Sequence, residues 1–271
     1  MSLRSKIFQL TLKAIAPFQD KLNRFKLAKR VFQLFYDKLA PNQWVLADVN
    51  GVKIYVNIAD RYLGRFMLQY GEYEKGTTKV FMKTVKKGMT FVDVGACTGY
   101  YTLIAAKLVG ADGKVFAFEP EPLNFEWLVR SISINGFKNI LPIRKAVSDK
   151  NGLIELYLDK DNIGGHSIVR NRGESILVEA VALDNFFKDQ TPDVVKIDIE
   201  GAEILALRGM EQIIKRSKEL SLFVEFLYNK KEILDFLSKY FEVYLITKDG
   251  KLIPFDEKLR GDFEPNLYCV R

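Results

Sequence analysis

The run with the clearest chemical character is Asp93-Val94-Gly95-Ala96-Cys97-Thr98-Gly99, an acid followed two residues later by a glycine turn. Gly95 permits a tight turn, and the small residues from Ala96 to Gly99 let a ligand approach the backbone closely. A pyrophosphate would be repelled by Asp93, whereas the methionine ammonium of S-adenosylmethionine would pair with it. The run also lacks the G-x-G-x-x-G spacing of dinucleotide-binding turns. We therefore expect an adenosyl sulfonium ligand here, with an ordinary glycine-containing turn as the alternative.

A second carboxylate follows in Phe118-Glu119-Pro120, twenty positions after Gly99. An acid at the end of the second strand can accept hydrogen bonds from both ribose hydroxyls of an adenosine ligand. Nicotinamide-dependent enzymes use the same device, so Glu119 and Pro120 indicate adenosine without naming the cofactor. A surface-exposed glutamate at a strand end is the alternative interpretation.

A third group of acids lies in Lys196-Ile197-Asp198-Ile199-Glu200-Gly201. Methyl transfer to a hydroxyl requires a group that takes the hydroxyl proton. We expect Asp198 or Glu200 to do this, and Asp198 also to contact the cofactor. His166 is a further candidate because it follows two glycines, although a lone loop histidine is more often a solvated side chain. Tyr100, directly after the glycine turn, is a candidate for lining the methionine end of the site.

Four ordered motifs resemble the FkbM-type methyltransferase family: DVGACTGYYTLIAAKLVG, VFAFEPEPLNFEWL, AVSDKNG and VVKIDIEGAEILALRGM. The resemblance covers about residues 70–228. It implies the class I methyltransferase fold, S-adenosylmethionine as the donor, and O-methylation of small molecules or sugars. The positions that match are Asp93, Gly95 and Gly99 for the cofactor loop, Glu119 for the ribose, Ser148 and Asp149 for the segment beside the adenine, and Asp198 and Glu200 for the acids after the fourth strand.

One position departs from the family pattern. Cys97 stands where the family commonly has asparagine. A small thiol fits the same space but cannot make the hydrogen bonds of an amide. The first forty and the last forty residues lie outside the resemblance, so it implies nothing about them.

These motifs need a scaffold that brings them to one edge. From about residue 78, short apolar runs alternate with helical segments, which predicts a doubly wound α/β fold with a mostly parallel, seven-stranded Rossmann-like sheet. Ligands bind such sheets beyond the carboxyl ends of the strands. The expected strands are 91–94, 115–118, 139–147, 194–197, 222–226, 241–246 and 266–270, and the expected helices are 101–109, 122–135, 202–215 and 230–239.

The chain divides by pattern into three parts. Residues 1–42 are predicted to form a basic extension of amphipathic helices, with Leu3, Ile7 and Leu10 on one apolar stripe. Residues 43–77 contain a hairpin at Asn50-Gly51 and a connecting segment. Residues 78–271 form the expected methyltransferase domain, with a strand insertion at about 151–182.

Composition narrows the function further. Residues 1–40 carry nine Lys and Arg against two Asp, so they account for the whole net charge of +7. The neutral remainder argues against nucleic acid as a partner. With two distant cysteines and one histidine, no Cys/His zinc site can form, and no metal is expected. No apolar run approaches the roughly 18 residues that span a bilayer, so a cytoplasmic protein is expected.

The sequence thus predicts an S-adenosylmethionine-dependent O-methyltransferase that acts on a hydroxyl of a small molecule, sugar or glycolipid. A nicotinamide-dependent oxidoreductase and a non-catalytic membrane or protein adaptor remain as alternatives. Residues 1–40 could contact the inner face of the membrane peripherally, or cap the catalytic domain or a second subunit. The identity of the acceptor and of the base, metal dependence, the oligomeric state and the role of the N-terminal extension stay open.

Overall fold

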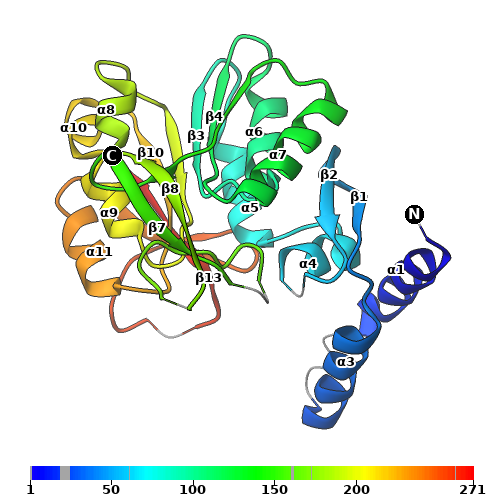
Figure 1. Ribbon diagram of the computed structural model, residues 1–271. Coiled ribbons are helices and arrows are strands. Elements are labelled where there is room, and N and C mark those ends of the chain that lie inside the picture. The colour runs from blue at the N-terminus through cyan, green and yellow to red at the C-terminus, as the bar shows by residue number, and fades with distance from the viewer. Residues whose placement is uncertain (1, 19–24, 61, 160–161, 172, 260) are drawn as a thin grey trace.

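The computed structural model describes residues 2–18, 25–60, 62–159, 162–171, 173–259 and 261–271. Its main element is an eight-stranded sheet (Figure 1). In spatial order the strands are β12 (Leu252–Pro254), β11 (Glu242–Thr247), β13 (Phe263–Val270), β10 (Ser221–Glu225), β9 (Val194–Ile197), β3 (Thr90–Val94), β4 (Lys114–Phe118) and β5 (Ile140–Ile143).

The five strands from β10 to β5 run parallel, and β13 is antiparallel to both β10 and β11. This is the predicted doubly wound, mostly parallel sheet, with one strand more than the expected seven. The additional strand, β12, pairs with β11 across the turn at Thr247–Lys251. β12 has three residues, which are too few for an alternation of polar and apolar side chains to predict a strand.

Helices cover both faces of this sheet (Figure 1). Alternate strand residues point to opposite faces, so that Phe91 and Val92 belong to two separate hydrophobic clusters. One face is covered by α5 (Lys75–Thr84), α6 (Tyr100–Val109) and α7 (Pro122–Asn135). The other is covered by α8 (Leu183–Phe187), α9 (Glu203–Arg208), α10 (Glu211–Arg216) and α11 (Lys230–Leu237).

Two predicted elements are divided in the structure. The helix expected at 202–215 breaks at Gly209, where the backbone passes so close to Ser148 that a Cβ would lie 2.1 Å from its carbonyl oxygen. The strand expected at 139–147 is split into β5 and β6 (Ala146–Val147). β6 leaves the main sheet and joins a three-stranded sheet of order β6-β8-β7, in which β7 (Gly152–Tyr157) and β8 (Ser175–Val181) form the inserted strand pair.

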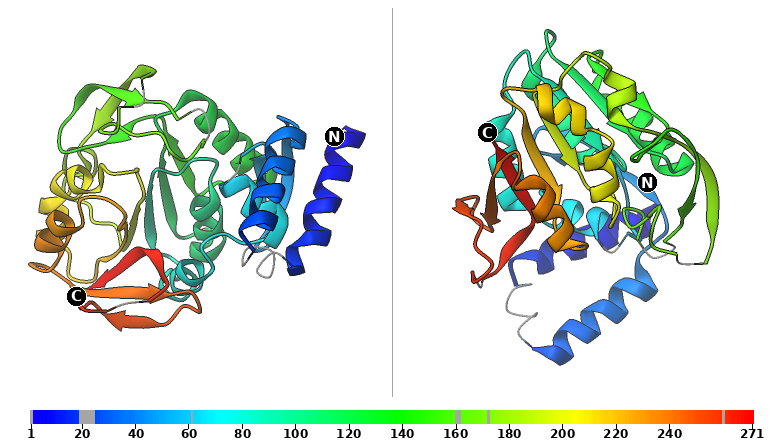
Figure 2. Two further views of the ribbon diagram at one scale, coloured as in Figure 1. Left: turned by 90° about the horizontal axis from the view of Figure 1, so that it is seen from below. Right: turned by 90° about the vertical axis from the view of Figure 1, so that its left-hand side faces the viewer.

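The N-terminal part consists of α1 (Leu3–Ile15), the 3-10 helix η1 (Ala16–Phe18), α3 (Lys26–Leu39), the hairpin β1 (Trp44–Val49) and β2 (Val52–Asn57), and α4 (Leu63–Tyr70). Figure 2 shows α1 and α3 on the side of the molecule away from the C-terminus. The hairpin predicted at Asn50-Gly51 forms, with φ of 51° and 74° at these residues.

The helices α1 and α3 bury only part of their apolar surface against each other and the neighbouring elements. Phe8 and Leu12 of α1 are buried, and Phe8 stacks on Phe35 of α3 at 5.4 Å between ring centroids. The stripe of Leu3, Ile7 and Leu10 instead faces outward and is exposed. No helix of the described residues combines the length and the apolar character that crossing a membrane requires.

The turn after β3 sets a strict requirement for glycine. Gly95 has φ of 86°, and a Cβ there would lie 1.9 Å from the carbonyl oxygen of Asp198. We expect Gly95→Ala to lower the free energy of unfolding by about 3 kcal/mol, from left-handed strain plus backbone overlap. Gly136→Ala is the control, because Gly136 has φ of 69° but nothing within 4 Å, and it should lose about 1 kcal/mol. Urea denaturation measures both, and equal losses would contradict the close approach.

Candidate functional site

Three strand ends converge on the glycine turn. The amides of Gly95 and Ala96 both donate to the carbonyl oxygen of Phe118 at the end of β4, at 3.0 and 2.9 Å. The amide of Asp198, after β9, donates to the carbonyl oxygen of Val94 at 3.0 Å. Because these bonds join backbone to backbone, the loops after β3, β4 and β9 form one connected edge, as the parallel sheet requires.

Glu119 is held rigidly beside this turn. Its Oε2 accepts from the amide of Cys97 at 2.8 Å and its Oε1 accepts from the amide of Glu121 at 2.9 Å. Burial raises the pKa of Glu119 to about 8, although both amide donors oppose the shift. Each carboxylate oxygen keeps a second lone pair for a further donor. Glu119 can therefore receive two hydroxyl groups on its open side.

Glu119 forms one wall of a narrow apolar slot of about 50 Å³. We call this space the apolar slot. Its walls come from β4, α7, β6 and the inserted segment, and the residues that define it are Phe118, Glu119, Pro120, Asn124, Lys145, Ala146, Val147, Leu156, Ile163, His166 and Ile168.

A larger space of about 510 Å³ lies on the other side of the turn, within the range of small-molecule sites. We call it the acidic cavity. Among the residues that the structure describes, six carboxylates, two cations and five tyrosines line it. Its defining residues are Glu74, Asp93, Asp159, Asp198, Glu200 and Glu225, the cations Arg170 and Lys196, and Tyr62, Tyr73, Tyr100, Tyr101 and Tyr228.

Lys196 is the buried counter-charge of the acidic cavity. It is 1% exposed, its Nζ lies 2.6 Å from Oδ2 of Asp198, and it sits 4.6 Å from the ring centre of Tyr101. Burial alone would lower the pKa of Lys196, but the negative charges of Asp198 and Glu74 outweigh it and raise the pKa. Lys196 therefore stays protonated and compensates part of the surrounding negative charge.

Two deeply buried acids remain incompletely compensated. Asp93 accepts from Oγ1 of Thr102 at 2.6 Å, and burial raises the pKa of Asp93 to about 6. Glu225 is 5% exposed, and no described residue donates to its Oε2. Burial, with the negative charge of Asp198 next in effect, raises the pKa of Glu225 to about 11. Among the described lining residues acidic groups therefore outnumber basic ones, and a cationic ligand would favour the ionised form of the acids whose pKa is raised.

Most predicted site residues come together here. Asp93, Gly95, Ala96, Tyr100, Asp198 and Glu200 line the acidic cavity, while Glu119 and Pro120 line the apolar slot. Gly95 and Asp198 line both spaces, so they mark the point where the two meet. Tyr100 contributes through packing, since its hydroxyl is bonded to Thr78 at 3.0 Å.

Other predicted site residues lie elsewhere. Ser148 and Asp149 line neither space; Ser148 is buried under Gly209, and its Oγ lies 3.1 Å from Oδ1 of Asp149. Gly99 caps the start of α6 without lining either space. His166 lines the apolar slot beside Glu119 and is absent from the cavity that holds Asp198 and Glu200.

Sequence reasoning missed three groups that the structure adds. Glu225 is the last residue of β10, and an acid at the end of a predicted strand could have been recognised as a site candidate from the sequence. Glu74 precedes the predicted catalytic domain, where a charged residue is typical of a linker, yet its Oε2 accepts from the hydroxyl of Tyr101 at 2.7 Å, inside the cavity. Asn124 lies in the first turn of α7, and nothing in the sequence distinguishes it as a site residue. Within the described ranges, no group of three or more His, Cys, Asp and Glu side chains is arranged to hold a metal ion.

Comparison with known proteins decides the family. Residues 93–244, more than half of the chain, match the methyltransferase FkbM domain. The chain belongs to the FkbM methyltransferase family. Its methyl donor is S-adenosylmethionine, and the predicted cofactor and α/β fold are confirmed. The oxidoreductase and adaptor alternatives are thereby set aside.

Individual relatives of this FkbM methyltransferase are distant. It is 25% identical to the hexuronic acid methyltransferase AglP of Haloferax volcanii over 182 residues, which cover 66% of this chain and 72% of AglP. It is similar in fold to an S-adenosylmethionine-dependent O-methyltransferase of Thermotoga maritima, with 14% identity, a TM-score of 0.44, and coverage of 90% of this chain and 81% of that one. An rRNA methylase of Streptococcus thermophilus gives 15% identity, a TM-score of 0.44, and coverage of 72% and 92%.

The residues present fit S-adenosylmethionine. Gly95 lines both spaces and carries no side chain, so its backbone borders the site directly. Glu119 offers paired acceptor oxygens for a ribose, and the carboxylates of Asp93 and Asp198 in the acidic cavity suit the cationic sulfonium and ammonium groups. Bound there, the cofactor supplies an electrophilic methyl group.

The raised pKa of Glu119 predicts a pH-dependent affinity. Ribose hydroxyls donate to the carboxylate, so a proton on Glu119 competes with the ligand. We expect the Kd for S-adenosylhomocysteine to fall as the pH rises towards about 8, by up to about tenfold per pH unit, and then to level off.

Isothermal titration calorimetry with Glu119→Gln tests this assignment. The variant should bind weakly and lose that part of the pH dependence. Glu126→Gln, which removes an exposed carboxylate of α7, should keep the wild-type profile. An unchanged pH profile in Glu119→Gln would show that another group titrates.

Proposed function

We propose that this protein methylates a hydroxyl group of a sugar or of a small molecule or lipid that carries one. The observation that carries the proposal is the acidic cavity, in which carboxylates and tyrosines surround a space of about 510 Å³. Carboxylates accept hydrogen bonds from hydroxyl groups, and aromatic rings provide apolar surface against which a sugar ring can pack. The similarity to a hexuronic acid methyltransferase supports the same class of acceptor.

Glu200 is our choice for the base. Asp198 lines both spaces and pairs with Lys196, which supports a role in holding the cofactor, whereas Glu200 lines the acidic cavity alone. Burial, followed by the charge of Asp198, raises the pKa of Glu200, and the Arg170 guanidinium opposes the shift. A carboxylate with a raised pKa is a better proton acceptor near neutral pH.

The inserted segment fixes Glu200 in position. Arg170 pairs with its carboxylate and lies 4.3 Å from the ring centre of Tyr228. The hydroxyl of Ser167 donates to the carbonyl oxygen of Glu200 at 2.8 Å, and φ at Glu200 is 57°. Since several contacts hold this unusual backbone conformation, the side chain is preorganised for an acceptor in the cavity.

Two substitutions separate the roles of the acids. We expect Glu200→Gln to lower the turnover of a hydroxyl acceptor by about 10²- to 10⁴-fold while leaving the Kd for S-adenosylhomocysteine unchanged. Asp198→Asn should weaken that Kd as well, because it leaves the buried Lys196 unpaired. Glu126→Gln is the exposed control. The assay measures S-adenosylhomocysteine released from S-adenosylmethionine with hexuronic acids, neutral hexosides and nucleotide sugars. Full turnover by both variants would refute the assignment.

We further propose that α1 and α3 contact an anionic membrane surface. Leu3, Ile7 and Leu10 are 74%, 56% and 68% exposed, and Leu27, Val31 and Leu34 repeat the same spacing on α3. Two apolar stripes therefore face outward, on the part of the chain that carries all of the net positive charge. Apolar residues flanked by Lys and Arg are typical of helices that lie in a membrane interface. Such contact would suit an acceptor sugar attached to a lipid.

Flotation with vesicles tests the membrane proposal in the full-length chain, since removing α1 would also expose the surface under Phe8 and Leu12. The wild type should float with vesicles of equal parts phosphatidylcholine and phosphatidylglycerol, and much less with phosphatidylcholine alone. The double variant Ile7→Glu, Leu10→Glu should stay at the bottom, whereas Leu177→Glu, at an equally exposed leucine of β8, should float. A wild type that fails to float and sediments as a dimer would assign the stripes to a second copy.

A further inference from the structure

The apolar slot contains a buried polar group that has no partner. Asn124 is 2% exposed and its Nδ2 donates to the carbonyl oxygen of Ile163 at 2.7 Å. No described residue donates to its Oδ1, although this atom is fully buried and Asn124 lines the slot. A buried carbonyl oxygen without a donor is costly to keep. The wall of the slot therefore contains an acceptor that lacks a donor.

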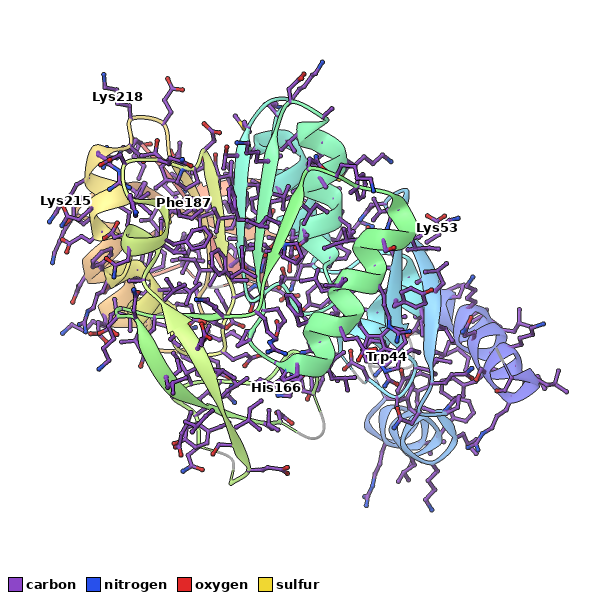
Figure 3. The ribbon with its side chains drawn as sticks, turned by 45° about the horizontal axis from the view of Figure 1, so that its top comes forward. Trp44, Lys53, His166, Phe187, Lys215 and Lys218 are labelled. Carbon is purple, nitrogen blue, oxygen red and sulfur yellow. The ribbon has the colours of Figure 1, made fainter. Side chains whose placement is uncertain are left out.

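A donor belongs to the same slot. Nδ1 of His166 accepts from the amide of Asp159 at 2.9 Å. Burial lowers the pKa of His166, so the ring is neutral near pH 7 and carries its hydrogen on Nε2. His166 lines the slot together with Asn124, and Figure 3 shows it beside the end of α7.

We propose that Asn124 and His166 recognise the amino edge of the adenine ring of the cofactor. The 6-amino group of adenine is a donor, which matches Oδ1 of Asn124, and its ring nitrogens are acceptors, which match Nε2–H of His166. The remaining walls include Val147, Leu156 and Ile168, aliphatic side chains suited to the faces of a flat ring. A 6-oxo purine would set an acceptor against the Asn124 oxygen.

The same two residues link recognition of the base to the inserted segment. Ile163 and Asp159, their backbone partners, both lie in that segment, which also supplies Arg170 to the acidic cavity. Asn124 and His166 are thus bonded to the backbone of the same segment whose Arg170 pairs with Glu200.

Calorimetry with three ligands tests the proposal without a methyl acceptor, so its outcome does not depend on the sugar assignment. The ligands are S-adenosylhomocysteine, its 6-oxo analogue S-inosylhomocysteine, and the analogue whose purine has no 6-substituent. The wild type should bind the adenosyl compound at least about tenfold more tightly than either analogue. In Asn124→Ala this preference should shrink to about twofold.

Conservative variants separate recognition from anchoring of the segment. Asn124→Asp keeps an oxygen in place of Oδ1 but loses the donor to Ile163, and should keep the preference for the amino group. His166→Asn keeps an acceptor for the Asp159 amide but lacks the distal donor, and should lose affinity, whereas His166→Gln should recover part of it. The proposal is overturned if the wild type binds all three ligands equally, or if Asn124→Ala weakens all three by the same factor with an unchanged melting temperature.

Discussion

The site of this methyltransferase depends on one buried positive charge, the ammonium group of Lys196, which compensates several neighbouring carboxylates. Lys196 projects from β9 among Asp93, Asp198, Glu74 and Glu225, which come from four separate parts of the chain. One cation cannot balance four carboxylates, of which Asp93 and Glu225 are buried, and the protonation of Glu225 absorbs part of the difference. The fold therefore keeps a site whose electrostatics improve when a positively charged cofactor binds.

The backbone around Gly95 divides this centre into two parts with opposite character. On one side the apolar slot accepts a flat ring next to Glu119, and on the other the acidic cavity accepts charged and hydroxyl groups. Asp198 lines both, and its carbonyl oxygen fills the place that a side chain at Gly95 would need. A donor with an aromatic end and a cationic end matches this division, and Gly95 and Asp198, which line both parts, would border its middle.

The sequence predicted the features that depend on the spacing of residue types along a short stretch of chain. Strand-turn-helix patterns located the parallel sheet and the edge that carries Gly95, Glu119 and Asp198, since each lies directly after a buried strand. It could not show contacts made over long distances. Glu74 lies in the cavity, where its carboxylate accepts a hydrogen bond from the hydroxyl of Tyr101, a residue well separated from it in the sequence. Asn124 is a polar helix residue, and its residue type does not distinguish it from many surface residues. The stripe on α1 was visible, but the face that packs, with Phe8 and Leu12, was decided by α3 and α4.

The most direct measurement is a crystal structure of the protein with S-adenosylhomocysteine. We expect the adenine in the apolar slot, the ribose hydroxyls on the Glu119 carboxylate, and the amino acid end in the acidic cavity near Asp93 and Asp198. A ligand bound outside these two spaces, or one with its adenine among the carboxylates of the cavity, would contradict it.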